Sequence, residues 1–163
     1  YFDESGFTQS SALPYAWSPI GHPREVPAYS HSQRLNVLGF LSRQSKLIYH
    51  STIATITTEV VIDAFDRLVA QKPPDAFAIV VLDNASIHRS AHFQRKRLDW
   101  LNQRVHVVYL SPYSPELNLI EILWRKVKYE WLPLTAYESF SSLKDHVHKV
   151  LSGYGSEYRI TFL

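Results

Sequence analysis

Three acidic residues stand where metal-dependent chemistry could be built. Asp3 lies in a short β-rich run, Asp83 directly follows the apolar run 76–82, and Glu121 falls within a helical pattern. Mg²⁺ prefers carboxylates, waters and phosphate oxygens as ligands. Two such ions about 3.5–4 Å apart can hold both the attacking and the leaving oxygen of a phosphoryl displacement. The three acids therefore indicate a two-metal site, provided that the fold brings them together.

Each acid also has an ordinary interpretation. The Asp83-Asn84 pair suits a turn after a strand, and an acid close to a chain end, such as Asp3, is usually solvated. Glu121 can form an i,i+4 pair with Arg125, which stabilises a helix by about 0.2–0.5 kcal/mol. It is the position of the acids on their elements, more than their number, that favours the metal site.

The helical pattern at 117–132 places Glu121 at the border of the buried face. At about 100° per residue, one face carries the apolar residues Leu117, Ile120, Trp124, Val127 and Trp131. Glu121 lies off this stripe, with Arg125 and Lys128 one and two turns away. Glu116 is the competing third acid, and it ranks second because it precedes the helix and can serve as a first-turn acid.

The elements that must position these acids follow from the hydrophobic pattern. Strands are expected at 1–8, 35–42, 46–52, 76–82, 105–110 and 158–162, and helices at 57–71, 90–103, 117–132 and 138–151. A meander followed by alternating helices and strands predicts an α/β fold with a mixed sheet, its first three strands antiparallel, its later strands parallel, and helices on both faces.

Two segments refine this expectation. The run 76–82 is continuously apolar, which is typical of a strand covered on both faces. Asp83 would then lie beyond the carboxyl end of a parallel strand, where sites of open α/β sheets are found. Residues 9–34 are expected to form a long loop, in which Tyr15 and Trp17 either stack on a base or cap the core.

Length and composition limit which structures and functions the chain can have. The 163 residues correspond to one domain. The absence of cysteine excludes disulfides, zinc–cysteine sites, iron–sulfur clusters and thiol catalysis. A net charge of +2 permits a nucleic-acid partner without arguing for one. No apolar run approaches the roughly 20 residues of a membrane helix, so no membrane partner is expected. The chain has no methionine, even at position 1, which indicates a fragment of a longer protein or the second piece of a split reading frame.

Three segments together resemble the transposases of the mariner superfamily, most closely its bacterial insertion-sequence branch. They are DESGF at 3–7, LDNASIHRS at 82–90 and SPYSPELNLIEILWRKVK at 111–128. Shorter matches at Tyr15-Ala16-Trp17 with Gly21 and at 35–39 extend the resemblance over nearly the whole chain. The helix motif and the Asp-Asn-Ala-x-x-His stretch are specific when taken together.

The resemblance implies a ribonuclease H-like catalytic domain with a DDE triad formed by Asp3, Asp83 and Glu121, all three binding metal. Thirty-seven residues, 84–120, separate the last two acids, which fits the superfamily. The implied activity is cut-and-paste transposition: Mg²⁺-dependent cleavage of DNA strands and strand transfer, with two ions and with Mn²⁺ able to substitute.

The resemblance also implies partners. These are transposon-end DNA, a target at a TA dinucleotide, and a second copy of the chain in a synaptic complex, in a bacterial cytoplasmic, nucleoid-associated setting. The family's N-terminal helix-turn-helix region is expected to be absent, which leaves residues 1–163 as a single catalytic domain.

Backbone phosphates are bound by local positive charge, which carries no sequence information. The candidate DNA-binding residues are Asn84, His88, Arg89, Arg95, Lys96, Arg97, Arg125 and Lys128. His88 and Asn84 are alternatively partners that orient a metal ligand. His88 can also be a loop histidine that hydrogen-bonds the backbone, and the cations can be a solvated helix surface.

Two other functions stay open at this stage. One is a nuclease of the same fold that does not join strands. The other is a non-catalytic transposase remnant that binds DNA or a partner chain. The intact triad argues against the remnant, whereas the missing DNA-binding region argues for it.

Overall fold

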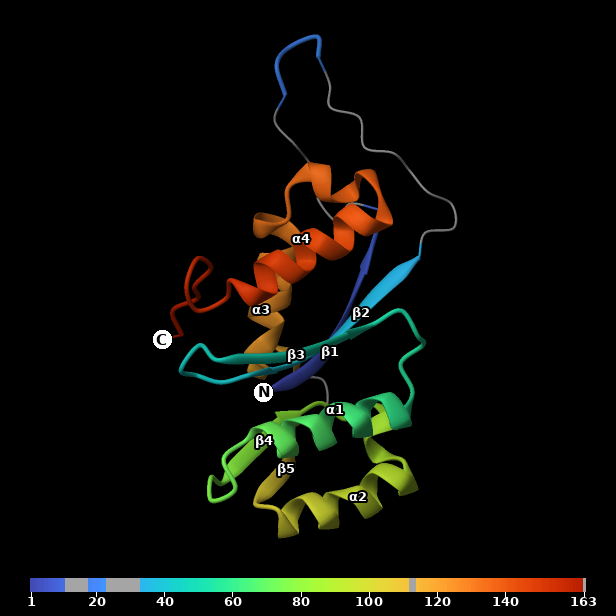
Figure 1. Ribbon diagram of the computed structural model, residues 1–163, viewed down its shortest axis with the longest axis vertical. Coiled ribbons are helices and arrows are strands. Elements are labelled where there is room, and N and C mark those ends of the chain that lie inside the picture. Colours follow the sequence, from blue (N-terminus) through green and yellow to red (C-terminus); the bar gives the residue numbers. More distant parts are fainter. Residues whose placement is uncertain (11–17, 23–32, 112–113, 163) are drawn as a thin grey trace.

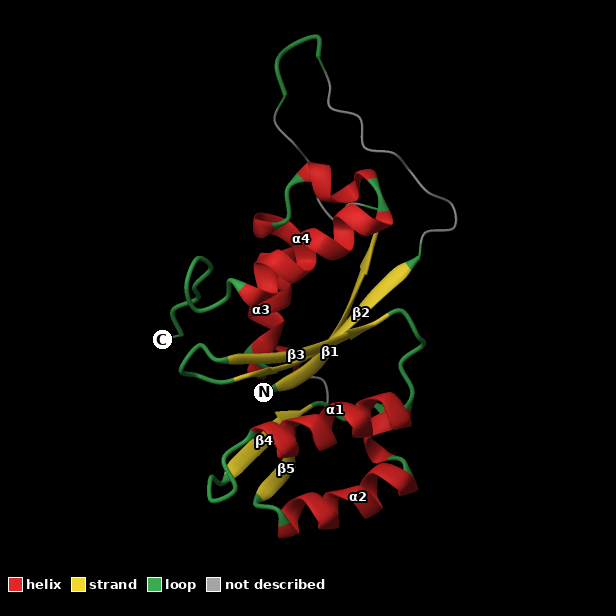
Figure 2. Cartoon of the chain, viewed as in Figure 1, coloured by secondary structure: helices red, strands yellow, loops and turns green. Residues whose placement is uncertain are grey.

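The computed structural model describes residues 1–10, 18–22, 33–111 and 114–162. Figures 1 and 2 show strands at the centre with helices packed around them. The described strands form an antiparallel sheet in the order β1 (Phe2–Thr8), β2 (Arg34–Leu41), β3 (Leu47–Thr52), and a parallel pair of β4 (Ala78–Leu82) and β5 (Val105–Tyr109). The α-helices are α1 (Thr58–Gln71), α2 (Ala91–Asn102), α3 (Ile120–Lys126) and α4 (Phe140–Ser152). The predicted α/β fold class is confirmed.

The antiparallel sheet is covered on both faces because its strands alternate in the direction of their side chains. One face, which includes Phe2 and Leu38, packs against α1. The opposite face, which includes Phe7 and Val37, packs against α3 and α4. β4 lies next to β1, although the hydrogen bonding of the described strands separates the two sheets.

The expectation that strand 76–82 is covered on both faces is wrong. In β4, Val80 and Leu82 are buried, but Ile79 is 58% exposed, and Val108 on the same face of β5 is 39% exposed. Among the described residues, α1 and α2 cover only the other face. A continuous apolar run does not report how many neighbours a strand has, so this could not be read from the sequence.

Gly39 allows α3 to approach the sheet closely. A β-carbon at this position would lie 2.9 Å from Cδ1 of Ile120 and 2.9 Å from Cη2 of Trp124. Real β-carbons essentially never come so near to a neighbour. Both contacted side chains are buried in the core, so neither can swing out of the way. The glycine therefore sets the position of the helix that carries Glu121.

We expect Gly39→Ala to destabilise the chain by about 1–3 kcal/mol, the usual cost of overpacking a core. Urea unfolding followed by tryptophan fluorescence measures this. Gly6→Ala is the matched control, since a β-carbon there meets only the end of the flexible Arg34 side chain. Equal stability of the Gly39 variant and the wild type would show that α3 does not depend on this contact.

The predicted helix at 117–132 is broken into three parts. A 3₁₀ turn at Pro115–Leu117 precedes α3, and a π-helical turn at Val127–Trp131 follows it. As predicted, Ile120, Trp124 and Val127 are buried. Leu117 is 51% exposed, so its predicted place on the buried stripe is wrong, and Trp131 is only partly buried. At the 3₁₀ turn, Asn118 and not Leu117 turns inward, where it bonds the backbone of β1.

The chain ends differently from the expectation. No strand forms at 158–162 in the described residues. Tyr154 and Tyr158 make only an isolated bridge. The expected positions of Tyr15 and Trp17 lie outside the described residues, as do Pro112 and Tyr113. Within the described part of the chain, no helix is long and apolar enough to cross a bilayer.

Candidate active site

The first residues of β1 are held between the two segments that carry the other acids. On one side, Nδ2 of Asn118 donates a hydrogen bond of 3.0 Å to the carbonyl oxygen of Phe2, which fixes the start of α3 beside β1. On the other side, the ring of His88 bridges Glu4 and Asp83. Asp3 lies between these two attachments. The fold therefore brings the segments that carry Asp3, Asp83 and Glu121 to one end of β1.

The pKa of Asp3 is shifted because its carboxyl group is buried close to several other acidic side chains. Burial raises the pKa of Asp3 to about 8, with further raising contributions from the carboxylates of Glu121, Glu4 and Asp83. Each of these acids acts on Asp3 because like charges close together disfavour ionisation. A site that keeps several carboxylates together in this way has the chemistry of a cation site.

His88 is the main structural tie within the site. Its side chain is buried, with Nε2 at 2.9 Å from Oε1 of Glu4 and Nδ1 at 2.8 Å from Oδ1 of Asp83. Burial disfavours the charged ring, but the hydrogen bonds to the two carboxylates outweigh it and raise the pKa of His88 to about 9. The protonated ring donates from both nitrogens and holds Asp83 to β1.

The segment after β4 folds as a turn around Asp83. Oδ1 of Asp83 accepts a hydrogen bond of 3.0 Å from the backbone N–H of Ala85, and a 3₁₀ turn at Ser86–Arg89 then presents His88. The hydrogen bond from His88 lowers the pKa of Asp83, and the Ala85 N–H adds to this effect. The turn interpretation and the functional interpretation of Asp83 are thus compatible.

Asn84 fastens this turn to the neighbouring strand. Its Nδ2 donates to the carbonyl oxygen of Leu110, just beyond β5, and its Oδ1 accepts from Arg89. These contacts give Asn84 and Arg89 a structural role in holding the loop that carries Asp83. Their expected contact with DNA is not tested by the geometry.

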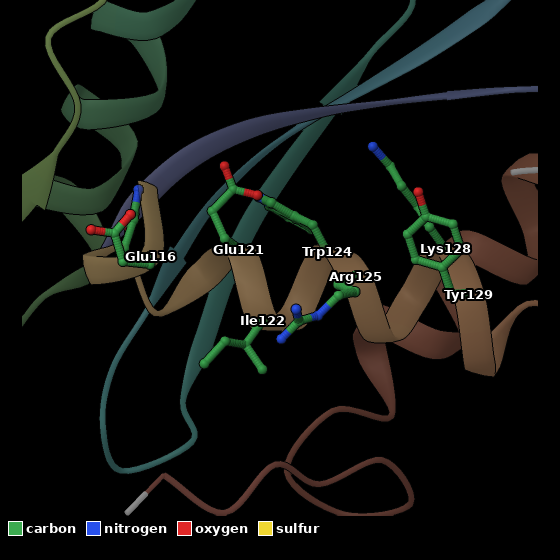
Figure 3. Close-up of a pocket in the computed structure, with 8 residues that line it drawn as sticks. Glu116, Glu121, Ile122, Trp124, Arg125, Lys128 and Tyr129 are labelled. Carbon is green, nitrogen blue, oxygen red and sulfur yellow. The ribbon is translucent and has the colours of Figure 1, made fainter. Parts of the chain in front are cut away.

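Glu121 lines an open pocket of about 470 Å³ along α3 (Figure 3). Glu121 and Lys128 point to one side of the helix, whereas Arg125 points to the other. No ion pair joins Glu121 to Arg125 in the described residues, so the i,i+4 pair considered above does not form. Glu116 is exposed on the 3₁₀ turn at the end of the same pocket.

The predicted basic cluster on α2 lies apart from α3. The helix α2 packs against β5 and α1, whereas α3 packs against β1 and β2. Lys96 forms a salt bridge of 2.9 Å with Asp66, and Arg97 donates to the carbonyl oxygen of Val107. Arg95 is exposed. Much of the charge on α2 is therefore engaged within the protein.

The residues present fit a hard divalent cation by their chemistry. The acids supply oxygen ligands, which Mg²⁺ and Mn²⁺ prefer, and the neighbouring carboxylates disfavour ionisation of Asp3, an effect that a bound cation would oppose. In the described part of the chain, no three acidic or histidine side chains are already arranged to hold one ion. The fit thus rests on ligand type and charge.

Sequence reasoning missed two residues of this site. Glu4 was not among the predicted site residues, yet it accepts a hydrogen bond from His88. Asn118 was not among the predicted site residues either, yet it is buried and binds β1. No local pattern marked these two residues, because each makes its contact with a segment far away in the chain.

Comparison with known proteins agrees with this geometry. The model of the DDE superfamily endonuclease family matches residues 1–144. No curated protein matches the chain by sequence. Among solved structures, the Mos1 transposase paired-end complex with left transposon end has a TM-score of 0.60 and 17% identity, over 93% of this chain and 46% of that one.

A second solved structure gives the same picture. The Mos1 mariner paired end complex with Mn has a TM-score of 0.60 and 16% identity, over 93% of this chain and 47% of that one. The chain spans less than half the length of either protein. These likenesses establish a shared fold, the ribonuclease H-like fold of a transposase. Because the family model covers residues 1–144, the chain belongs to the DDE superfamily endonucleases.

Proposed function

We propose that the chain is the catalytic domain of a cut-and-paste transposase of the mariner superfamily, in its bacterial insertion-sequence branch. The observation that carries the proposal is the meeting of acids from three separate elements at the start of β1. The family match and the similar fold of the Mos1 complexes support it. A bacterial cytoplasmic, nucleoid-associated location goes with this branch.

Asp3, Asp83 and Glu121 would hold two Mg²⁺ ions, for which Mn²⁺ substitutes. When bound, the ions activate the attacking oxygen and neutralise the leaving oxygen of an in-line displacement. Asp83 has Oδ1 engaged by His88 and Ala85, so Oδ2 is the oxygen that we assign to the cation. His88 keeps this carboxylate in place and charged, and Glu4 holds the other ring nitrogen.

The partners follow from the proposed reaction. Transposon-end DNA is the first substrate, a TA dinucleotide the target, and a second copy of the chain the partner in the synaptic complex. The solved Mos1 structures include a paired-end complex and a strand transfer complex, which support this choice of partners.

A strand-transfer assay tests the proposal. The chain is incubated with Mg²⁺, supercoiled plasmid and a labelled duplex that ends in a pre-cut 3′-hydroxyl. Joining of the label to the plasmid is the expected result. Nicking without joining would favour the second candidate, a nuclease of the same fold. Neither nicking nor joining, with DNA binding intact, would favour the non-catalytic remnant.

We expect DNA binding by this chain to be non-specific and strongly dependent on salt. A Kd on the order of 10⁻⁴–10⁻⁶ M near physiological salt is expected, because the net charge is only +2 and phosphate contacts dominate. Arg125→Ala combined with Lys128→Ala should weaken binding to any duplex and flatten the salt slope. Fluorescence anisotropy with a terminal-repeat duplex and a scrambled duplex measures this. Tight binding to the repeat alone would contradict the expectation.

A further inference from the structure

Gly6 lies in β1, the outermost strand of the antiparallel sheet among the described strands. It pairs with Asn36 of β2, and among the described strands β1 forms hydrogen-bonded pairs only with β2. The other edge of β1 has no hydrogen-bonded partner among the described strands, although β4 lies near part of β1. Gly6 is three residues from Asp3, about 10 Å at the rise of a strand.

The side chain of Arg34 lies across Gly6. A β-carbon at Gly6 would collide with Nε, Cζ and Nη2 of the guanidinium. The guanidinium is held there by a hydrogen bond of 2.8 Å from Nε to Oδ1 of Asn36. The glycine in the Asp-Glu-Ser-Gly-Phe motif thus makes room for an arginine that comes from the next strand.

Lys128 reaches the same stretch of β1 from the side of α3. Its Nζ lies 5.5 Å from the ring centre of Phe7, and Lys128 lines a cavity of about 160 Å³ together with Gly6, Thr8 and Ser10. Within the described residues, neither Arg34 nor Lys128 forms an ion pair with a carboxylate. Lys128 therefore lies at a hollow that also offers hydroxyl groups, and Arg34 lies over Gly6, one of the residues that line this hollow.

The electrostatics support an anion at this place. Burial lowers the pKa of Lys128, and the positive charge of Arg34 adds to the lowering, while Glu121 and Asp3 oppose it. The two like charges repel each other, and an anion that interacts with both would offset the repulsion. A guanidinium can donate two parallel hydrogen bonds to two oxygens of one phosphate, whereas an ammonium binds a phosphate as a point charge.

We propose that Arg34 and Lys128 together bind one backbone phosphate of the DNA strand, next along the strand from the phosphate that reacts at Asp3. The proposal rests on the proposed function. It adds a specific phosphate-binding site and explains why position 6 is a glycine. Gly6 is a positioning residue here, since it acts only by letting Arg34 lie against β1.

Two independent variants test this site in the 163-residue chain. Arg34→Ala removes the guanidinium, and Gly6→Ala displaces it without removing any charge. Both should weaken binding of a labelled duplex by about tenfold at low salt, as expected for loss of a charged hydrogen bond. Both should lower the slope of log K against log salt by about 0.9, the share of one phosphate. Arg43→Ala, just beyond the opposite end of β2, removes the same charge and should change neither quantity.

The outcomes separate this site from the proposed function. If wild type cleaves and joins DNA while Arg34→Ala binds as wild type does, the phosphate site is wrong and the function stands. A loss in Arg43→Ala equal to that in Arg34→Ala would show a general charge effect and overturn the site. If Gly6→Ala fails to fold in a thermal melt, Arg34→Ala decides alone. Wild type that binds DNA but never cuts it would overturn the function and leave the site standing.

Discussion

Glu121→Gln should abolish both strand cleavage and strand transfer, with a loss of more than about 100-fold. Loss of a residue that only orients a metal ligand typically costs 10–100-fold, and loss of a ligand itself should cost more. Glutamine keeps the size of the side chain but removes the charge that binds the cation. Because Glu121 is exposed and lies off the buried face of α3, the variant should fold as wild type does. The measurement is the joining of a pre-cut duplex to a plasmid, with circular dichroism to confirm the fold.

Glu116→Gln is the matched control. Glu116 lines the same pocket and is also exposed, but it lies on the 3₁₀ turn before α3. The same change of charge at this position should leave most of the activity. An inactive Glu116 variant beside an active Glu121 variant would show that the third acid has been assigned to the wrong residue.

His88→Ala should have the largest effect on stability of the changes around the site, about 2–4 kcal/mol. The change leaves Glu4 and Asp83 without their common partner and removes a buried ring that contacts Phe2 and Phe93. Removing one partner of a buried charged pair costs several kcal/mol, and the value is at the lower end here because Asp83 is half exposed. Urea unfolding gives the free energy.

A second readout separates the positioning role of His88 from simple loss of stability. At a temperature where the variant is folded, the Mg²⁺ concentration that gives half-maximal cleavage should rise, because Asp83 is no longer held. His148→Ala is the control, since His148 also contacts two hydroxyl groups, those of Tyr49 and Ser51, but lies on α4. An unchanged metal requirement in His88→Ala would mean that the histidine supports the fold alone.

Much of the fold follows from local pattern. Helix α1 begins at Thr58 after the cap Thr57 and ends before Lys72-Pro73, as the sequence indicates. The hairpin of β2 and β3 appears where two β-rich runs flank a polar turn. The errors arise where a distant contact decides. Leu117 is exposed because Asn118 turns inward to the backbone of Phe2, and no helical periodicity reports a partner 116 residues away.

In the candidate site, too, local patterns were informative and contacts between distant residues were not. The elements that carry Asp3, Asp83 and Glu121 were predicted from strand and helix patterns, and the structure brings them together. The bridge from Glu4 through His88 to Asp83 was not predicted, because it joins residues 84 positions apart in the chain. Likewise, nothing in the sequence shows that Arg34 lies over Gly6.

The central claim is that Asp3, Asp83 and Glu121 hold the metal ions of a strand-transferring enzyme. The most direct test is a crystal of the chain with a pre-cut DNA end and Mn²⁺, with diffraction data collected at the manganese absorption edge. The account predicts two anomalous peaks about 3.5–4 Å apart, ligated by these three carboxylates and by a DNA phosphate. Peaks that are held instead by Glu116, or that lie away from Asp3 altogether, would contradict it.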